Sequence, residues 1–539
     1  MKITKYLFLL SVGVLFGCQS AKKYNAFNQQ KIAVKKLHKD IDFTQRKFIK
    51  MHPDSDLYIP ADSLNDLFAQ AKANISEPLT PSEFYKHIAP VIAAVRQGHS
   101  RVVFPSEKIT KQYSKKYKDT RGPFSQFGYA WTNDTLYVNL NVSANKNVAL
   151  GSKVLQINGV APKTLYADYV RNNTSDGFNT TYLEKGFDKR FAQQFLDRFG
   201  TLDSISYVLQ CQDSIYTVTN KRFPIKKKEL KPQLDSLGLD KSDSLKTIKK
   251  LTKEEMILAK AKKKRENETF KKDARKRRML GVVNGTYNRE LLFPITSDSS
   301  YAVLKIKSFS VGRYKASYDS LFKTINTKKI EHLVLDLRDN PGGRIADIDE
   351  LYAYLKMKDE PLLGTATVTS KAKLPGYFIA GKSLGTYVAL TPVYPFLYSW
   401  VYLNTSKNEN GIYTYKVAGL KNKEIKDLAY KNKLSVLVNG GSFSASCIIT
   451  SNLQGSGRAL VYGEETGGTF NGTVAGIMPL LKLPNSKLRV RTGLMHIKPY
   501  YTTETFGRGI FPNVEIPLTT DEVIFGFNLP YEIIYKNNK

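Results

Sequence analysis

Cysteine is scarce in this sequence, which has only three among its 539 residues: Cys18, Cys211 and Cys447. Three cysteines are too few for a disulfide framework, and none belongs to a CxxC pair or to a Cys/His cluster of the kind that binds structural zinc. We therefore expect a fold stabilised by its hydrophobic core, without a disulfide framework or a structural zinc site.

Long apolar runs are scarce as well. After the N-terminus, no stretch approaches the about 18 continuous apolar residues of a membrane-spanning helix. The N-terminal apolar run, residues 6–16, follows Lys2 and Lys5 and ends just before Cys18, which is the layout of a signal peptide. A small residue before a cysteine resembles the lipobox of bacterial lipoproteins. We expect residues 1–17 to be a lipoprotein signal peptide and Cys18 to carry the lipid; the alternative is an ordinary cleaved signal that contains a cysteine.

The expected compartment follows from this anchor. No acidic sorting signal follows the cysteine in "CQSAKKY", which favours an inward placement. We expect a lipid-anchored protein of the cell envelope, on the periplasmic side of the outer membrane.

Acidic residues are few relative to basic ones, and the formal net charge is +34. Residues 221–278 alone carry 22 basic and nine acidic side chains. This segment has a helix-forming composition and few aromatic rings on which bases would stack, so nucleic-acid binding is disfavoured. We predict a basic helical insertion over residues 221–280 that faces an anionic membrane or envelope polymer. A solvated insertion without a partner is the alternative.

The rest of the chain has the composition of a folded protein, with 42% hydrophobic and 12% aromatic residues. Apolar residues at three-and-four spacing predict a helical N-terminal region over residues 18–122. Short β-type runs with turns between them predict a β-rich domain over residues 123–220. From residue 281 to residue 539, strands alternate with helices, which predicts an α/β domain.

Two turns in this α/β domain have the residues that catalysis needs. The first is Asp336–Gly343, "DLRDNPGG", after an apolar strand; its glycines lack a Cβ, so their N–H groups would form one wall of an oxyanion hole. The second is "LVNGGSFSAS", in which Ser444 at a tight turn would be a nucleophile and the Ala445 N–H an oxyanion donor. The alternatives are a plain β-to-α turn and a helix cap.

Four blocks, in this order, resemble the catalytic domain of the tail-specific (C-terminal-processing) protease family. They are "LVLDLRDNPGG", "LVNGGSFSAS", "RALVYGEETGG" and "GRGIFPNVEIP". The resemblance implies a crotonase-like α/β catalytic core and peptide-bond hydrolysis through an acyl-enzyme. Residues 150–165, "LGSKVLQINGVAPKTL", are similar to the distal part of a PDZ-type module. On this resemblance the nucleophile is Ser444, with Ser442 and Ser446 as fallback candidates, and the oxyanion hole is Gly342 or Gly343 with the Ala445 amide.

The base cannot be the lysine that bacterial processing proteases of this family use. That lysine lies about 25 residues after the serine, where this chain has Thr469, and no lysine occurs between Ser444 and Lys482. The tricorn-like branch of the family uses a histidine from the N-terminal side instead. His99 in "QGHSR" resembles the glycine–histidine–hydroxyl motif of other members, and a neutral imidazole has a suitable pKa for a base. His496 is the second candidate.

A third group must orient the imidazole. The tricorn-like pattern has a serine beside the histidine and a glutamate near the C-terminal end. We assign these roles to Ser100 and Glu504, although the family acid aligns better with Phe506. With this resemblance, the sequence predicts a serine peptidase that acts on envelope proteins or peptides and uses no metal and no organic cofactor. The alternatives are a catalytically inactive ligand- or peptide-binding protein on the same scaffold, and a membrane scaffold that works through the basic insertion.

Overall fold

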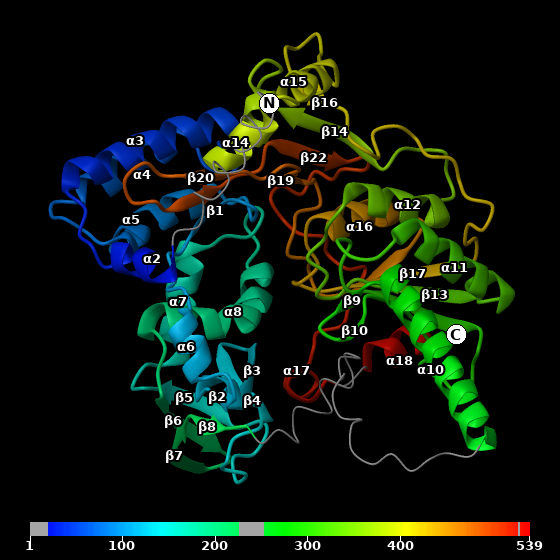
Figure 1. Ribbon diagram of the computed structural model, residues 1–539. Helices are drawn as coiled ribbons and strands as arrows, with labels where there is room; N and C mark the ends of the chain where they lie inside the picture. Colours follow the sequence, from blue (N-terminus) through cyan, green and yellow to red (C-terminus); the bar gives the residue numbers. More distant parts are fainter. Residues whose placement is uncertain (1–19, 226–252, 527–528, 539) are drawn as a thin grey trace.

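The structure is a computed structural model that describes residues 20–225, 253–526 and 529–538 (Figure 1). The expected signal peptide, its lipidation site Cys18 and the middle of the basic insertion lie outside these residues. In the described part of the chain, no helix is long and apolar enough to cross a membrane.

The chain begins with four helices whose buried faces follow the spacing of the apolar residues. Leu37 and Phe48 of α3 are fully buried, and α5 begins at a capping box between Thr80 and Glu83. A short turn that contains His99 connects α5 to the first strand. The elements are α2 (Ala21–Asn28), α3 (Val34–Met51), α4 (Ala61–Ala73), α5 (Pro81–Ala93) and β1 (Arg101–Val103).

The β-rich unit is a five-stranded antiparallel sheet in the order β3-β4-β5-β6-β7. It has a hydrophobic core of its own, in which Phe187 and Phe191 of α8 pack near Trp131 of the sheet. The elements of this part are α6 (Lys111–Lys116), β2 (Thr120–Arg121), η2 (Phe124–Gln126), β3 (Phe127–Thr132), β4 (Thr135–Asn141), β5 (Lys153–Ile157), α7 (Pro162–Asn172), α8 (Thr181–Phe199), β6 (Ser204–Cys211), β7 (Ser214–Lys221) and β8 (Phe223–Pro224).

The α/β unit contains a six-stranded sheet in the order β11-β12-β13-β17-β18-β23, parallel from β12 onward. Strand β13 is buried along its whole length, as is usual for a parallel strand between helical layers. Because the carboxyl ends of parallel strands share one edge, the turns after β13 and β17 meet there. The elements are β11 (Arg289–Leu292), β12 (Tyr301–Ile306), α11 (Tyr314–Thr327), β13 (His332–Asp336), α12 (Ile345–Leu355), β17 (Lys433–Val438), α16 (Ala445–Gly455), β18 (Leu460–Gly463), β23 (Val514–Glu515), α17 (Thr520–Phe525) and α18 (Leu529–Lys536).

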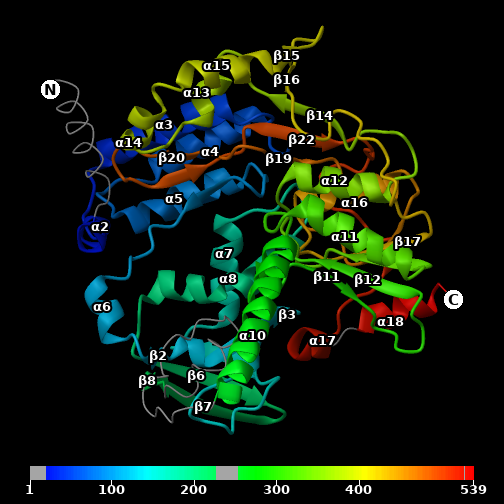
Figure 2. The ribbon, with the colours of Figure 1, turned by 45° about the vertical axis from the view of Figure 1, so that its right-hand side comes forward.

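Two further sheets complete the unit. One has the order β15-β16-β14-β22-β19, and the other, β1-β21-β20, joins the strand after the N-terminal helices to two strands from the C-terminal part. Figure 2 shows α5 lying beside β20. The elements are β14 (Leu363–Val368), α13 (Leu374–Phe378), α14 (Leu384–Leu390), α15 (Tyr394–Leu403), β15 (Thr405–Lys407), β16 (Tyr413–Tyr415), β19 (Thr473–Ala475), β20 (Leu480–Lys482), β21 (Arg489–Arg491) and β22 (Met495–Pro499).

The N-terminal helices and the α/β unit share one hydrophobic core. Buried residues of α3 and α5, such as Phe48 and Ile88, belong to the same cluster as Leu335 of β13 and Ile449 of α16. The turn that carries His99 is therefore fixed to the α/β unit by packing.

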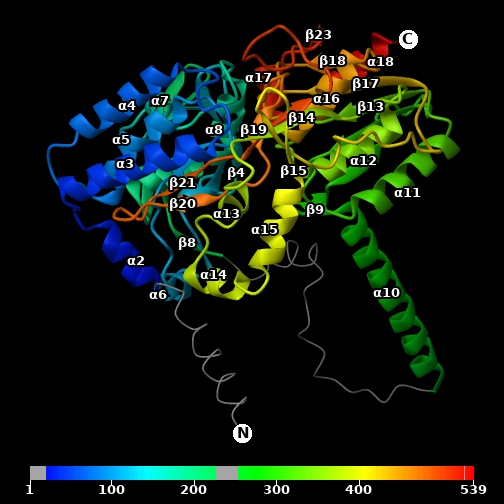
Figure 3. The same cartoon turned by 90° about the horizontal axis from the view of Figure 1, so that it is seen from above.

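The described end of the basic insertion is helical. α10 (Lys253–Leu280) extends away from the body of the molecule in Figure 3. The chain then enters the short strands β9 (Val282–Val283) and β10 (Thr286–Tyr287) before the main sheet.

Candidate active site

Ser444 lies at a strained turn between β17 and α16. Its φ of 55° and ψ of −115° are outside the regions that non-glycine residues usually adopt, and such strain is common at functional sites. The amide oxygen of Asn439 holds the turn in place by accepting from the backbone N–H groups of Asp339 and Gly441 at 2.9 Å each. The two turns predicted from the sequence are thus joined directly.

The structure brings His99 to this serine. His99 Nε2 lies 3.0 Å from Ser444 Oγ, although the residues are 345 positions apart. The imidazole also meets the Phe443 ring edge-on, with 5.1 Å between ring centroids. Gly98 permits this close approach, since a Cβ there would be 2.6 Å from the Phe443 ring.

The two expected glycine donors of the oxyanion hole differ in the structure. The Gly342 N–H donates to Asn340 Oδ1 at 2.9 Å, so it already has an acceptor. The Gly343 and Ala445 N–H groups donate to no residue that the structure describes. Gly342 is still in contact with the nucleophile turn, because a Cβ there would be 2.7 Å from the Ala445 nitrogen. The pair left available for a substrate oxyanion is therefore Gly343 and Ala445.

The second ring nitrogen of His99 faces a cation. Nδ1 lies 3.4 Å from Nη2 of Arg491. Burial, followed by the charges of Arg491 and Arg101, lowers the pKa of His99 from 6.5 to about 3. The imidazole is thus neutral at pH 7. A guanidinium only donates hydrogen bonds, so this arrangement favours the tautomer with its proton on Nε2.

Neither Ser100 nor Glu504 orients the imidazole, and this corrects the assignment made from the sequence. The Ser100 hydroxyl is buried and has no hydrogen-bond partner among the described residues, while its backbone N–H closes a turn onto Gln97. Glu504 is exposed in a loop, and no hydrogen bond or ion pair joins it to His99. Phe506, where the family acid aligns, packs against Tyr58 at 5.3 Å between ring centroids.

The second candidate base lies elsewhere. His496 on β22 is buried, and its Nδ1 contacts the Asp54 carboxylate. None of its hydrogen bonds within the described residues reaches Ser444. His496 therefore contacts a carboxylate but no candidate nucleophile, whereas His99 contacts the candidate nucleophile but no carboxylate.

The fallback serines have structural partners instead. Ser442 donates to the Leu337 carbonyl at 2.7 Å, and Ser446 donates to the Asn340 carbonyl at 3.0 Å. Cys447 is buried as expected, and burial raises the pKa of its thiol to about 12, which keeps it protonated.

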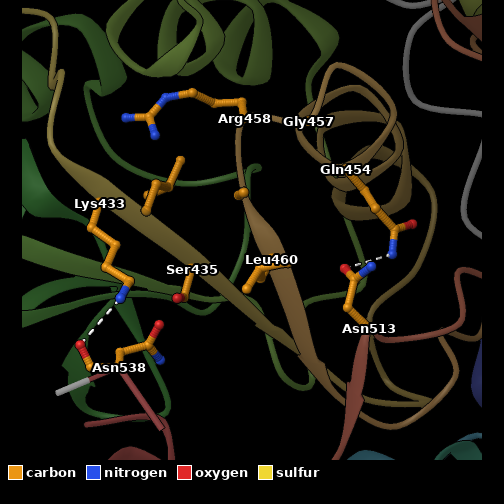
Figure 4. A pocket seen from close by; sticks show the side chains of 10 residues that line it. Lys433, Ser435, Gln454, Gly457, Arg458, Leu460, Asn513 and Asn538 are labelled. Atoms are coloured by element: carbon orange, nitrogen blue, oxygen red, sulfur yellow. Dashed lines mark hydrogen bonds between the residues drawn. The ribbon is translucent and has the colours of Figure 1, made fainter.

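Another Ser–His contact lies at the opposite end of the main sheet. His332 Nε2 is 2.9 Å from Ser435 Oγ within adjacent strands. Ser435 borders a cavity of about 310 Å³, shown in Figure 4, whose lining also includes Lys433 and Arg458. This cavity is distinct from the edge at which the two catalytic turns meet.

Sequence reasoning did not find several residues around His99. Asp176 accepts from the Gly98 N–H at 2.7 Å, and burial raises the pKa of its carboxyl to about 7. Arg491 approaches the imidazole because β21 pairs with β1. Of these residues, only Asp176 could have been noticed in the sequence, because Asp176-Gly177 is a typical turn dipeptide. Among the described residues, no group of three or more His, Cys, Asp or Glu side chains could hold a metal ion.

Comparison with known proteins finds similarity to peptidases. Residues 300–516 match the model of peptidase family S41. A curated relative, the carboxy-terminal-processing protease of Bartonella bacilliformis, is 25% identical over 218 residues. That match covers 40% of this chain and only 38% of the relative's length. The S41 match, together with this relative, supports a serine peptidase.

Solved structures agree at the level of the fold. Mature CPAF complexed with lactacystin has a TM-score of 0.59 and 13% identity, and the match covers 94% of this chain and 99% of that chain. A second structure of mature CPAF has a TM-score of 0.55 and 13% identity, over 93% and 97% of the two chains. The chain therefore has an S41 peptidase-like mixed α/β fold, as the α/β prediction expected.

Proposed function

We propose that this protein is a serine peptidase that hydrolyses peptide bonds of envelope proteins or peptides, with Ser444 as nucleophile and His99 as general base. The observation that carries the proposal is the 3.0 Å contact between His99 Nε2 and Ser444 Oγ at a strained turn. A hydroxyl needs such a neighbouring base, because an unperturbed serine is a weak nucleophile.

The residues act in a defined order. His99 must first hold its ring proton on Nδ1, and not on Nε2 as the contact with Arg491 favours. Ser444 Oγ then attacks the carbonyl carbon of the scissile bond while His99 Nε2 takes the hydroxyl proton. The Gly343 and Ala445 N–H groups stabilise the oxyanion that forms. The imidazolium returns the proton to the leaving amine, and an acyl-enzyme remains on Ser444. Water then attacks the ester, with His99 again accepting a proton, and releases the new carboxyl terminus.

Finer features of the protein are part of the same proposal. A tricorn-like branch is supported by the absence of a lysine near Thr469 and by the position of His99. A crotonase-like core is supported by the parallel sheet with helices between its strands. A PDZ-like module is supported by residues 150–165, which include β5, the turn that follows it and the start of α7. We also propose lipidation at Cys18 and a periplasmic position.

The basic insertion is proposed to face an anionic membrane or envelope polymer. In the last turns of α10, from residue 267 to residue 278, five of the twelve side chains are exposed and basic: Lys271, Lys272, Arg275, Lys276 and Arg278. Liposome binding by the full-length protein, compared with a variant that lacks residues 226–278, tests this idea.

One observation favours a second candidate function, a catalytically inactive peptide-binding protein. Within the described residues, Arg491 and no carboxylate faces Nδ1 of His99. A triad that lacks its acid retains a shaped site but is a weaker catalyst.

A fluorophosphonate serine probe separates the two functions. We expect wild-type protein to be labelled, and Ser444→Ala and His99→Ala to lose the label. Because a CPAF structure contains lactacystin, we also expect lactacystin to reduce labelling. A folded wild-type protein that takes no label would support the binding protein instead.

A further inference from the structure

Two arginines face each other beside the catalytic residues. In the antiparallel pair of β1 and β21, Arg101 is directly opposite Arg491. Like charges in this position destabilise a sheet. A third arginine, Arg190 of α8, adds to the repulsion: burial and then Arg190 lower the pKa of Arg101, while burial and then Arg101 lower that of Arg491.

These three cations have no acidic partner within the described chain. No ion pair among the described residues includes any of them. Arg190 Nη1 donates to the Tyr169 hydroxyl at 3.3 Å, and Arg491 Nη2 contacts the Met478 sulfur at 2.7 Å. The Nε atom of Arg101 is buried without a hydrogen-bond partner. A buried donor without an acceptor is costly, so this arrangement suits an anion supplied from outside the chain.

The cluster borders the reacting atoms. Arg491 Nη2 is 3.4 Å from His99 Nδ1. Tyr182, whose phenol interacts with all three arginines, stacks on Phe443 at 4.2 Å, next to Ser444. All three arginines are half-buried and therefore partly open to a ligand.

We propose that Arg101, Arg190 and Arg491 form a subsite that binds a carboxylate of the peptide substrate beside the scissile bond. This inference rests on the proposed peptidase function. The carboxylate is either an acidic side chain or the substrate's C-terminal carboxylate, since a guanidinium binds both in the same way.

The subsite also acts on the base. A carboxylate that accepts hydrogen bonds from Arg491 draws the guanidinium away from His99 Nδ1. Its negative charge also offsets the positive charge that disfavours the imidazolium. The His99 tautomer with a free Nε2 lone pair then becomes favourable, so a carboxylate substrate improves catalysis as well as binding. The pKa of His99, held near 3 in the free protein, rises in the complex.

Cleavage of a matched peptide series tests the proposal in the wild-type protein. Internally quenched peptides of one sequence carry Glu or Gln on either side of the cleaved bond, and a free or amidated C-terminus. We expect at least one carboxylate form to have a kcat/KM about tenfold or more above the neutral amide. The Glu and C-terminal arms distinguish the two sources. Equal values for all forms would overturn the subsite.

Variants assign the effect to the arginines. Arg491→Gln and Arg101→Gln should lose most of the preference for carboxylate and bring its kcat/KM close to that of the neutral peptide. Arg491→Lys should restore part of the preference, because it keeps the charge but not the fork of donors. Arg171→Gln, which removes an exposed arginine paired with Asp168, is the matched control and should keep it. A preference that survives in both Gln variants contradicts the proposal.

A binding measurement keeps the subsite testable if the protein proves inactive. Fluorescence anisotropy of the same peptides on Ser444→Ala needs no catalysis, and we expect the carboxylate form to bind about tenfold more tightly. Serine-probe labelling without carboxylate preference would refute the subsite and leave the peptidase intact. Carboxylate preference in binding, without labelling, would refute the peptidase and leave the subsite.

Discussion

Two serines are in contact with histidine in the part of the chain that the structure describes, and one of the two is at a site suited to catalysis. Ser444 Oγ lies 3.0 Å from His99, and Ser435 Oγ lies 2.9 Å from His332. Both imidazoles are kept neutral, since burial lowers the pKa of His332 to about 4 and that of His99 to about 3. Distance and protonation state therefore do not distinguish the two pairs.

The backbone around each serine does distinguish them. Ser435 lies near the beginning of β17, a central strand with a parallel neighbour on each side, and its backbone is regular strand. Ser444 is at a positive-φ turn in contact with Gly342, and the N–H groups of Gly343 and Ala445 have no acceptor among the described residues. This is the difference that we expect between a nucleophile and a structural serine, because a nucleophile needs a turn with available amides as well as a base.

Removal of each serine hydroxyl is the sharpest test of this comparison. We expect Ser444→Ala to lower kcat/KM on a fluorogenic peptide by at least about 10³-fold, because no acyl-enzyme can form. Ser435→Ala loses one internal hydrogen bond and should stay within about twofold. Comparable losses in the two variants would mean that the strained turn is not decisive.

Substitution of the two histidines should also lower kcat/KM at one site and not at the other, with a smaller loss than for the serines. His99→Ala removes the base and should lower kcat/KM by about 10²- to 10⁴-fold. His332→Ala leaves a gap within the sheet and should lower the melting temperature without a comparable loss of catalysis. Kinetic and thermal-melting measurements on both variants separate these outcomes. An unchanged kcat/KM in His99→Ala would mean that His99 is not the base.

A methyl group on Gly342 tests the contact between the two turns. Its Cβ would be 2.7 Å from the Ala445 nitrogen, and its φ is 91°. We expect Gly342→Ala to lower serine-probe labelling by about tenfold or more, since it displaces an oxyanion donor. Gly457→Ala is the control: its φ is 73° but nothing lies within 4 Å of the added carbon, so it has similar strain and should label normally.

The smallest expected effect is on pH dependence. A base must be unprotonated, so activity falls only as the pH approaches the pKa of His99, which lies near 3 in the free protein. With a neutral peptide, we expect kcat/KM to be flat from pH 7.5 to pH 5. Arg491→Gln removes a charge that lowers this pKa, so its acid limb should move to higher pH. Circular dichroism at each pH checks that the fold persists, and an acid limb near pH 6.5 in wild type would contradict the effect of burial.

The features that could be predicted from the sequence either depend on neighbouring residues or follow from the resemblance to a protease family. The glycine-rich turns after two apolar strands indicated the candidate oxyanion donors and Ser444. This was possible because the conformation of a turn depends on residues that are adjacent in the sequence. The α/β class followed from alternating strands and helices, and the family resemblance is supported by the S41 match. The catalytic roles themselves remain predictions.

What could not be predicted depends on long-range pairing. Arg491 meets His99 only because β21 pairs with β1 in one register, and a one-residue shift would turn the arginine to the other face. Glu504 has a plausible position in the sequence but lies in an exposed loop. Sequence spacing does not reveal which segments a shared core brings together.

The shared core has a consequence for where the working unit begins. The match to family S41 starts at residue 300, whereas His99 lies some 200 residues earlier, in a turn that packs with the α/β unit. A fragment trimmed to residues 300–516 would retain the proposed nucleophile and both proposed oxyanion amides but would lack the proposed base. Helices α2 to α5 thus belong to the proposed active unit as much as the sheet that holds Ser444, and a minimal fragment designed to test the proposed activity should retain them.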